Sequence, residues 1–86
     1  MIPLQDPRSG RVEAAIAGAA CRAARALLRW SVLELAHEAK VSPNTIVKLE
    51  NGGVIRSRSA MRIRARFARE GVELLDEPTP GARLRH

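Results

Sequence analysis

The residue types that most often carry covalent or metal chemistry are few in this 86-residue chain. Cys21 is the only cysteine, and His37 and His86 are the only histidines. A lone cysteine forms no internal disulfide, and no second His or Cys stands at ligand spacing from His37. No nucleophile is accompanied by a base, and no glycine loop of the phosphate-binding kind occurs. The sequence therefore predicts no enzyme, no cofactor and no metal site, and Cys21 is interpreted as a small buried hydrophobe rather than a redox sensor.

The chain is rich in positively charged residues. Fifteen Lys and Arg against nine Asp and Glu give a formal net charge of +6. Between residues 40 and 69 Glu50 is the only acidic residue, and the basic residues are Lys40, Lys48, Arg56, Arg58, Arg62, Arg64, Arg66 and Arg69. This balance favours a polyanionic partner, usually nucleic acid and less often an acidic membrane surface. We expect about half of the last four arginines to be simply solvated, because they cannot all face one phosphate strand.

Length and hydropathy set the class of protein. The chain is long enough for one small domain, and such a domain is marginal alone, so a partner chain would help it. No apolar run approaches the ~20 residues of a membrane span, and no secretory segment is visible. We therefore expect a cytoplasmic protein with no membrane partner. We divide it into a flexible lead-in over residues 1–11, a domain over 12–71, and a hairpin or tail over 72–86.

The elements that must position these residues are predicted from capping signals. An alanine-rich helix is expected over residues 12–29, with Gly18 as its weak point. Ser31 and Glu34 have the spacing of a capping box, which predicts a second helix ending near Lys40. Ser42 followed by Pro43 is a strong helix start. The run of residues 51–53, Asn-Gly-Gly, then ends this third helix, because Asn and Gly tolerate a left-handed backbone.

The rest of the chain predicts a fourth helix and a hairpin. Ser57 or Ser59 is expected to cap a helix that runs to Glu70 and buries Ala60, Ile63 and Phe67. Residues 72–74 and 82–84 alternate apolar and polar side chains around a Pro-Thr-Pro-Gly turn, which favours a two-stranded hairpin, with a frayed tail as the alternative. Trp30 is expected in the core rather than as a stacking platform.

Two short helices joined by a tight turn, as predicted over residues 31–51, form a helix-turn-helix that docks in the DNA major groove. The stretch around it resembles the Cro/cI-type (Xre-like) regulators. The resemblance is carried by Arg22-Ala-Ala-Arg-Ala-Leu-Leu-Arg-Trp-Ser31, Leu35-Ala36, Val41-Ser-Pro-Asn-Thr-Ile46 and Leu49-Glu50-Asn51-Gly52. The ending Gly71-Val-Glu-Leu-Leu75 with Gly81-Ala-Arg-Leu-Arg85 is similar to a small bacterial branch with a short β tail. The resemblance implies a mainly α, compact, lambda-repressor-like DNA-binding domain of four to five helices with a C-terminal β-hairpin.

The resemblance also implies roles for individual residues. Asn44 and Lys48 would face base edges, because Asn pairs with adenine and Lys donates to guanine. Arg25 and Glu50 would form a structural salt bridge between the first and third helices. The complete DNA-binding set is Ser42, Pro43, Asn44, Thr45, Val47, Lys48, Asn51, Arg56 and Arg58. The chain departs from the family at Val32, where a polar phosphate contact is usual, and at Lys40, where Gly is usual.

The expected function is sequence-specific binding of double-stranded DNA by a homodimer that regulates transcription, with the hairpin edge pairing two copies. Two alternatives stay open. An antitoxin-like protein would bind a toxin partner and autoregulate its operon. A non-specific nucleic-acid coat driven by the arginines would bind every sequence alike, with steep salt dependence.

Overall fold

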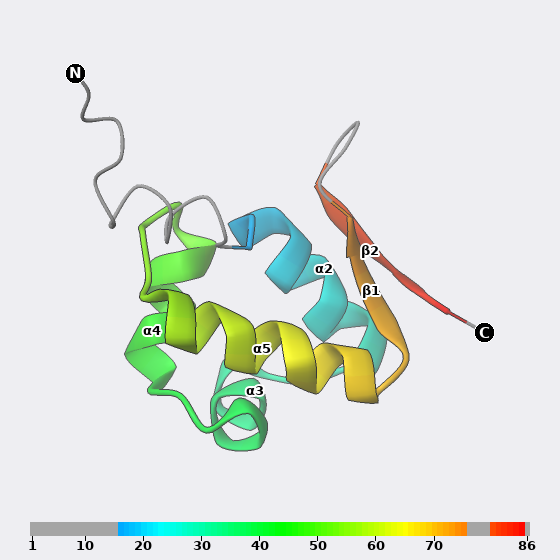
Figure 1. The fold of residues 1–86 in the computed structure, drawn as a ribbon, viewed down its shortest axis with the longest axis horizontal. Coiled ribbons are helices and arrows are strands. Elements are labelled where there is room, and N and C mark those ends of the chain that lie inside the picture. Colours follow the sequence, from blue (N-terminus) through cyan, green and yellow to red (C-terminus); the bar gives the residue numbers. More distant parts are fainter. Residues whose placement is uncertain (1–15, 76–79, 86) are drawn as a thin grey trace.

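The computed structural model describes residues 16–75 and 80–85, and this part of the chain is mainly helical. Its helices are α2 (Gly18–Leu28), α3 (Val32–Ala39), α4 (Pro43–Glu50) and α5 (Ser57–Arg69). A short antiparallel sheet follows, made of β1 (Val72–Leu75) and β2 (Gly81–Leu84). Figure 1 shows α5 crossing in front of the other helices and the hairpin lying along α2. Among the described residues no helix is long and apolar enough to cross a membrane.

The first helix is shorter than predicted. Ile16 and Ala17 are not helical, and Ala17 is the N-cap of α2 with an extended backbone (φ −66°, ψ 137°). Residues 12–15 of the predicted helix lie outside the described residues. At the other end Arg29 is not helical but takes a left-handed C-cap conformation (φ 58°). Gly18 is therefore the first residue of the helix rather than a weak point in its interior.

The predicted boundaries of α3 and α4 are confirmed. Ser31 Oγ accepts from the Glu34 amide at 3.0 Å, and the Ser31 amide donates to Glu34 Oε1 at 2.7 Å, so both bonds of the capping box are present. Lys40 ends α3 with φ 59°. Ser42 Oγ accepts from the Asn44 amide at 3.1 Å, and α4 begins at the next residue, a proline.

The run of residues 51–53 ends α4 as predicted, whereas the start of α5 differs from the prediction. Asn51 caps α4 with an ordinary negative φ of −94°, and the left-handed conformation falls on Gly52 (φ 88°). The predicted serine cap of α5 is wrong, because Arg56 occupies the N-cap position without a side-chain capping bond. Ser57 is instead the first helical residue.

One apolar core joins the helices to the hairpin. Its largest fully buried side chains include Leu35, Ile46, Leu49, Ile63 and Phe67. Trp30 is half-buried against this core and stacks on Phe67, with ring centroids 6.1 Å apart. Burying such apolar side chains contributes roughly 1.5–3 kcal/mol each. The predicted inward face of α5, made of Ala60, Ile63 and Phe67, is confirmed.

The predicted hairpin is confirmed, and it belongs to the core. Val72 pairs with Leu84 and Leu75 pairs with Gly81, which sets the register. Val72 is buried, and the sheet contacts both α2 and α5. Pro78 and Thr79 of the predicted Pro-Thr-Pro-Gly turn lie outside the described residues. A two-stranded ribbon is weak alone, so packing against two helices explains why it forms here.

Candidate nucleic-acid interface

The helix α4 has one buried face and one exposed face. Ile46 and Leu49 point into the core with 0% and 1% exposure. Asn44, Val47 and Lys48 lie on the opposite side and are exposed. Three and four residues separate neighbours on one side of a helix, so this division follows directly from the sequence. The exposed face offers an amide, an apolar side chain and an ammonium group to a partner.

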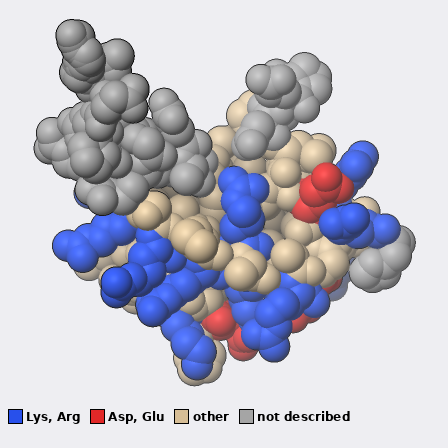
Figure 2. Space-filling view, in the orientation of Figure 1, with Lys and Arg blue, Asp and Glu red and all other residues tan. Residues whose placement is uncertain are grey.

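The other expected contact residues lie beside this face, and they differ in how far their side chains are exposed to solvent. Ser42, Pro43 and Asn51 are exposed at the two ends of α4, whereas Thr45 is half-buried. The Ser42 hydroxyl already accepts a capping bond, and its hydrogen stays available to donate. Arg56 and Arg58, at the start of α5, are also exposed. Figure 2 shows Lys and Arg side chains gathered over the side of the molecule where α4 and the start of α5 lie.

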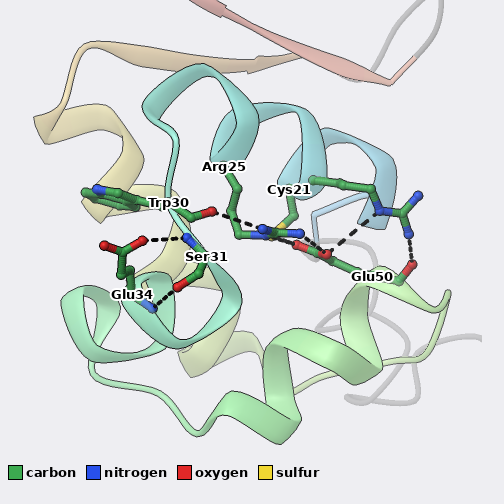
Figure 3. A network of polar contacts seen from close by, with 7 residues as sticks. Cys21, Arg25, Trp30, Ser31, Glu34 and Glu50 are labelled. Carbon is green, nitrogen blue, oxygen red and sulfur yellow. Dashed lines mark hydrogen bonds and ion pairs between the residues drawn. The ribbon is translucent and has the colours of Figure 1, made fainter.

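An ion pair fixes the far end of α4 to α2. Arg25 Nε lies 2.8 Å from Glu50 Oε2, and a second nitrogen of the guanidinium donates to Glu50 Oε1, also at 2.8 Å. The third guanidinium nitrogen donates to the Trp30 carbonyl at 3.0 Å. Figure 3 shows the Arg25 guanidinium between the Glu50 carboxylate and the Trp30 carbonyl. A bidentate pair of this kind fixes orientation as well as distance, so it sets the angle at which α4 is held.

Two further groups of α2 approach the same glutamate. The Cys21 thiol donates to Glu50 Oε2 at 3.2 Å, and the Arg22 guanidinium donates to the Glu50 carbonyl at 2.5 Å. Burial, together with the bond and charge of Glu50, raises the pKa of Cys21 to about 12, so the thiol stays protonated. Burial raises the pKa of Glu50, but the bonds from Arg25 and Cys21 and the nearby positive charges outweigh it and leave that pKa below its usual value. Cys21 is buried as predicted, but it is also a hydrogen-bond donor.

The start of α2 meets the end of α4 so closely that only glycine fits. A Cβ at Gly18 would overlap the Leu49 carbonyl oxygen and lie 3.0 Å from the Glu50 Cα. The Gly18 position is therefore fixed by the packing of two helices. Reasoning from helix propensity missed it, since propensity describes one helix and this constraint comes from another.

A second cluster holds α3 against α5, and sequence reasoning missed it too. Arg66 lies 2.7 Å from Glu38 and 2.8 Å from Glu70, and its guanidinium covers the Trp30 ring at 5.2 Å from the centroid. The bond to Glu38 raises the pKa of Arg66, and the bond from Arg66 lowers the pKa of Glu38. Arg66 is therefore engaged within the domain. The spacing of Arg66 and Glu70, four apart on a helix, was the available signal.

Together these residues present an exposed helix face, held from behind by the part-buried Arg25–Glu50 ion pair and flanked by arginines. No protein-family model matches the chain, and no curated protein matches it. The side chains described above are therefore the basis on which a function is proposed.

Proposed function

We propose that the protein is a sequence-specific DNA-binding regulator that inserts the exposed face of α4 into the major groove, as a lambda-repressor-like helix-turn-helix does. The observation that carries the proposal is the division of α4. Asn44, Val47 and Lys48 are exposed on a short helix whose other face is buried. Asn and Lys are side chains that read base edges, and each good contact discriminates by about 1–3 kcal/mol.

The connection between α3 and α4 supports this proposal. Only residues 40–42 separate the two helices, and a cap at each side defines the turn. In a helix-turn-helix the first helix crosses the DNA backbone while the second enters the groove. Such docking needs α4 held at a fixed angle, and the Arg25–Glu50 pair provides this.

The charge distribution supports DNA as the polyanion. Arg56 and Arg58 are exposed at the start of α5, and Ser42 and Asn51 stand at the ends of α4. In this proposal these four residues bind phosphates and set the register, while the centre of α4 reads the sequence. The net charge of +6 assists association at moderate ionic strength.

The functional unit in this proposal is a homodimer in the cytoplasm, because one short helix covers few base pairs. Val72 is buried, so deleting the hairpin would damage the core as well as any interface. Leu84 is 47% exposed on β2 and provides a cleaner test. If the hairpin edge joins two copies, Leu84→Lys shifts the mass measured by light scattering from dimer to monomer, whereas an unchanged mass contradicts this interface.

Selection from a randomised duplex pool at near-physiological salt tests DNA recognition. The native protein should enrich a two-fold-related motif. The double variant Asn44→Ala, Lys48→Ala should lose the motif while keeping weak, salt-sensitive binding. A matched control, His37→Ala with Arg85→Ala, removes one polar and one basic exposed side chain outside α4 and should keep the motif.

Two results would contradict the proposal. If no motif is enriched and the three proteins bind alike, the arginines act only as a charge patch. If the control loses the motif as completely as the α4 variant, the sequence is not read by α4. Co-purification of a stoichiometric protein with no DNA motif would favour the antitoxin-like alternative.

A further inference from the structure

A basic groove lies between α3 and the second half of α5, apart from the exposed face of α4. It is an open hollow of about 270 Å³. Its charged lining residues are Glu38, Lys40, Arg62, Arg66 and Arg69. In the described part of the chain none of its lining residues belongs to α4. The proposed DNA-reading face therefore leaves this groove unused.

The positive charge of the groove is only partly balanced. Glu38 is the one acidic residue in the lining, and Arg66 already holds it at 2.7 Å. Arg62 donates to the Lys40 carbonyl at 3.2 Å. This bond occupies one donor of the Arg62 guanidinium, but a carbonyl is neutral, so the charge of Arg62 has no ion-pair partner among the described residues. The side chain of Arg69 makes no ion pair within the same described part. Both arginines are exposed.

The pattern along α5 indicates which anion fits. Arg62, Arg66 and Arg69 are separated by four and three residues and form one stripe about 10 Å long. The middle member of the stripe binds two carboxylates, those of Glu38 and Glu70, at 2.7 and 2.8 Å. This surface thus already binds carboxylates. Arg62 and Arg69 lie on the same stripe, and their guanidinium groups have N–H donors that can bind further carboxylates.

From this geometry we infer that the groove is a docking site for an acidic helical segment of a partner protein. A helix with Asp or Glu at positions i, i+4 and i+7 has the same repeat as the arginine stripe, so its carboxylates reach Arg62 and Arg69 together. The groove is open, whereas a site for a small ligand normally encloses most of its ligand. Complementary charge of this kind speeds association and selects the partner.

A labelled helical peptide with glutamates at i, i+4 and i+7 is the probe, and an isomer with the same glutamates spread around the helix is its control. Fluorescence polarisation at about 150 mM salt measures both affinities. We expect the striped peptide to bind about tenfold more tightly than the isomer. Amide shifts in an NMR spectrum should change at residues 38–40 and 62–69.

Paired charge reversals locate the site on the protein. Arg62→Glu with Arg69→Glu should abolish the preference for the striped peptide. Arg64→Glu with Arg85→Glu makes the same change in net charge at exposed positions outside the groove and should preserve it. Should the first variant fail to fold by circular dichroism, Arg62→Gln with Arg69→Gln replaces it and should weaken binding about tenfold.

Three outcomes would overturn the inference. Equal affinity for the two peptides shows non-specific charge attraction. Amide shifts on α4 instead of the groove show that the peptide binds at another surface. Shifts at the groove with inorganic phosphate alone and none with peptide show a small-anion pocket. Because none of these results depends on DNA, failure here leaves the proposal for α4 standing.

Discussion

Among the described residues two arginine–glutamate clusters join helices to one another, and they differ in how far their carboxylates are removed from water. The side chain of Glu50 is 8% exposed beside Arg25, whereas those of Glu38 and Glu70 are 38% and 36% exposed beside Arg66. The nitrogen–oxygen distances are nearly equal, at 2.8 Å in the first cluster and 2.7 and 2.8 Å in the second. The distances alone therefore do not show which cluster contributes more to the stability of the fold.

Burial does rank them, because a carboxylate that loses its arginine must find another partner. Glu38 and Glu70 can turn to water, and solvent-exposed pairs contribute little to stability. Glu50 is enclosed between α2 and α4, so its desolvation is compensated only while Arg25, Arg22 and Cys21 surround it. The buried cluster thus fixes helix orientation, while the exposed one braces α3 against α5.

At neutral pH, removing the arginine of the buried cluster should have the largest effect. Arg25→Met leaves Glu50 buried without its main partner and should cost about 3 kcal/mol of unfolding free energy. Arg22 Nε lies 3.8 Å from Glu50 Oε1, and its charge offsets part of the loss. Urea denaturation measures the loss of unfolding free energy in Arg25→Met. The double variant Arg25→Met, Glu50→Leu should recover most of the stability, and failure to do so would mean that packing, not the stranded charge, is responsible.

Alkaline pH should weaken the same cluster through Cys21. The folded pKa of the thiol is about 12 against 9.0 for the free group, so between these values the unfolded chain releases a proton that the folded protein keeps. Stability from this group is complete below pH 9.0 and falls as pH rises, by about 1.4 kcal/mol per pH unit. Comparing wild type with Cys21→Ala isolates the effect. Parallel stability curves above pH 9.0 would refute it.

Breaking the exposed cluster should cost less. Arg66→Met removes two ion pairs whose carboxylates can rehydrate, together with the contact to the Trp30 ring. We expect the urea midpoint to fall by less than in Arg25→Met, and added salt to reduce the difference from wild type. If Arg66→Met matches or exceeds Arg25→Met, burial is not what separates the two clusters.

The smallest effect is expected at the left-handed helix ends outside both clusters. Lys40 and Arg29 have φ values of 59° and 58°, a conformation that glycine adopts more easily. Lys40→Gly and Arg29→Gly should each stabilise the fold by about 1 kcal/mol. Asn51→Gly is the control, because Asn51 has φ −94° and should gain nothing. Thermal unfolding measures all three, and an equal gain at Asn51 would rule out the conformational cause.

Features set by neighbours in sequence were predictable. The capping box of Ser31 and Glu34, the start of α4 after Ser42, and the two faces of α4 all depend on spacings of two to four residues. The starts of two helices were predicted less well. The start of α2 was placed too early, and Arg56 rather than a serine holds the cap position of α5.

The sequence by itself determined the helices, their inward faces and the excess of positive charge, because capping, periodicity and composition act locally. Only the tertiary structure decided that Gly18 must be glycine, that Cys21 donates to Glu50, and that Arg66 joins α3 to α5. Each of these depends on a group twenty-eight or more residues away, and the energy of such a contact depends on burial. Burial arises only when the helices pack, so no local pattern records it.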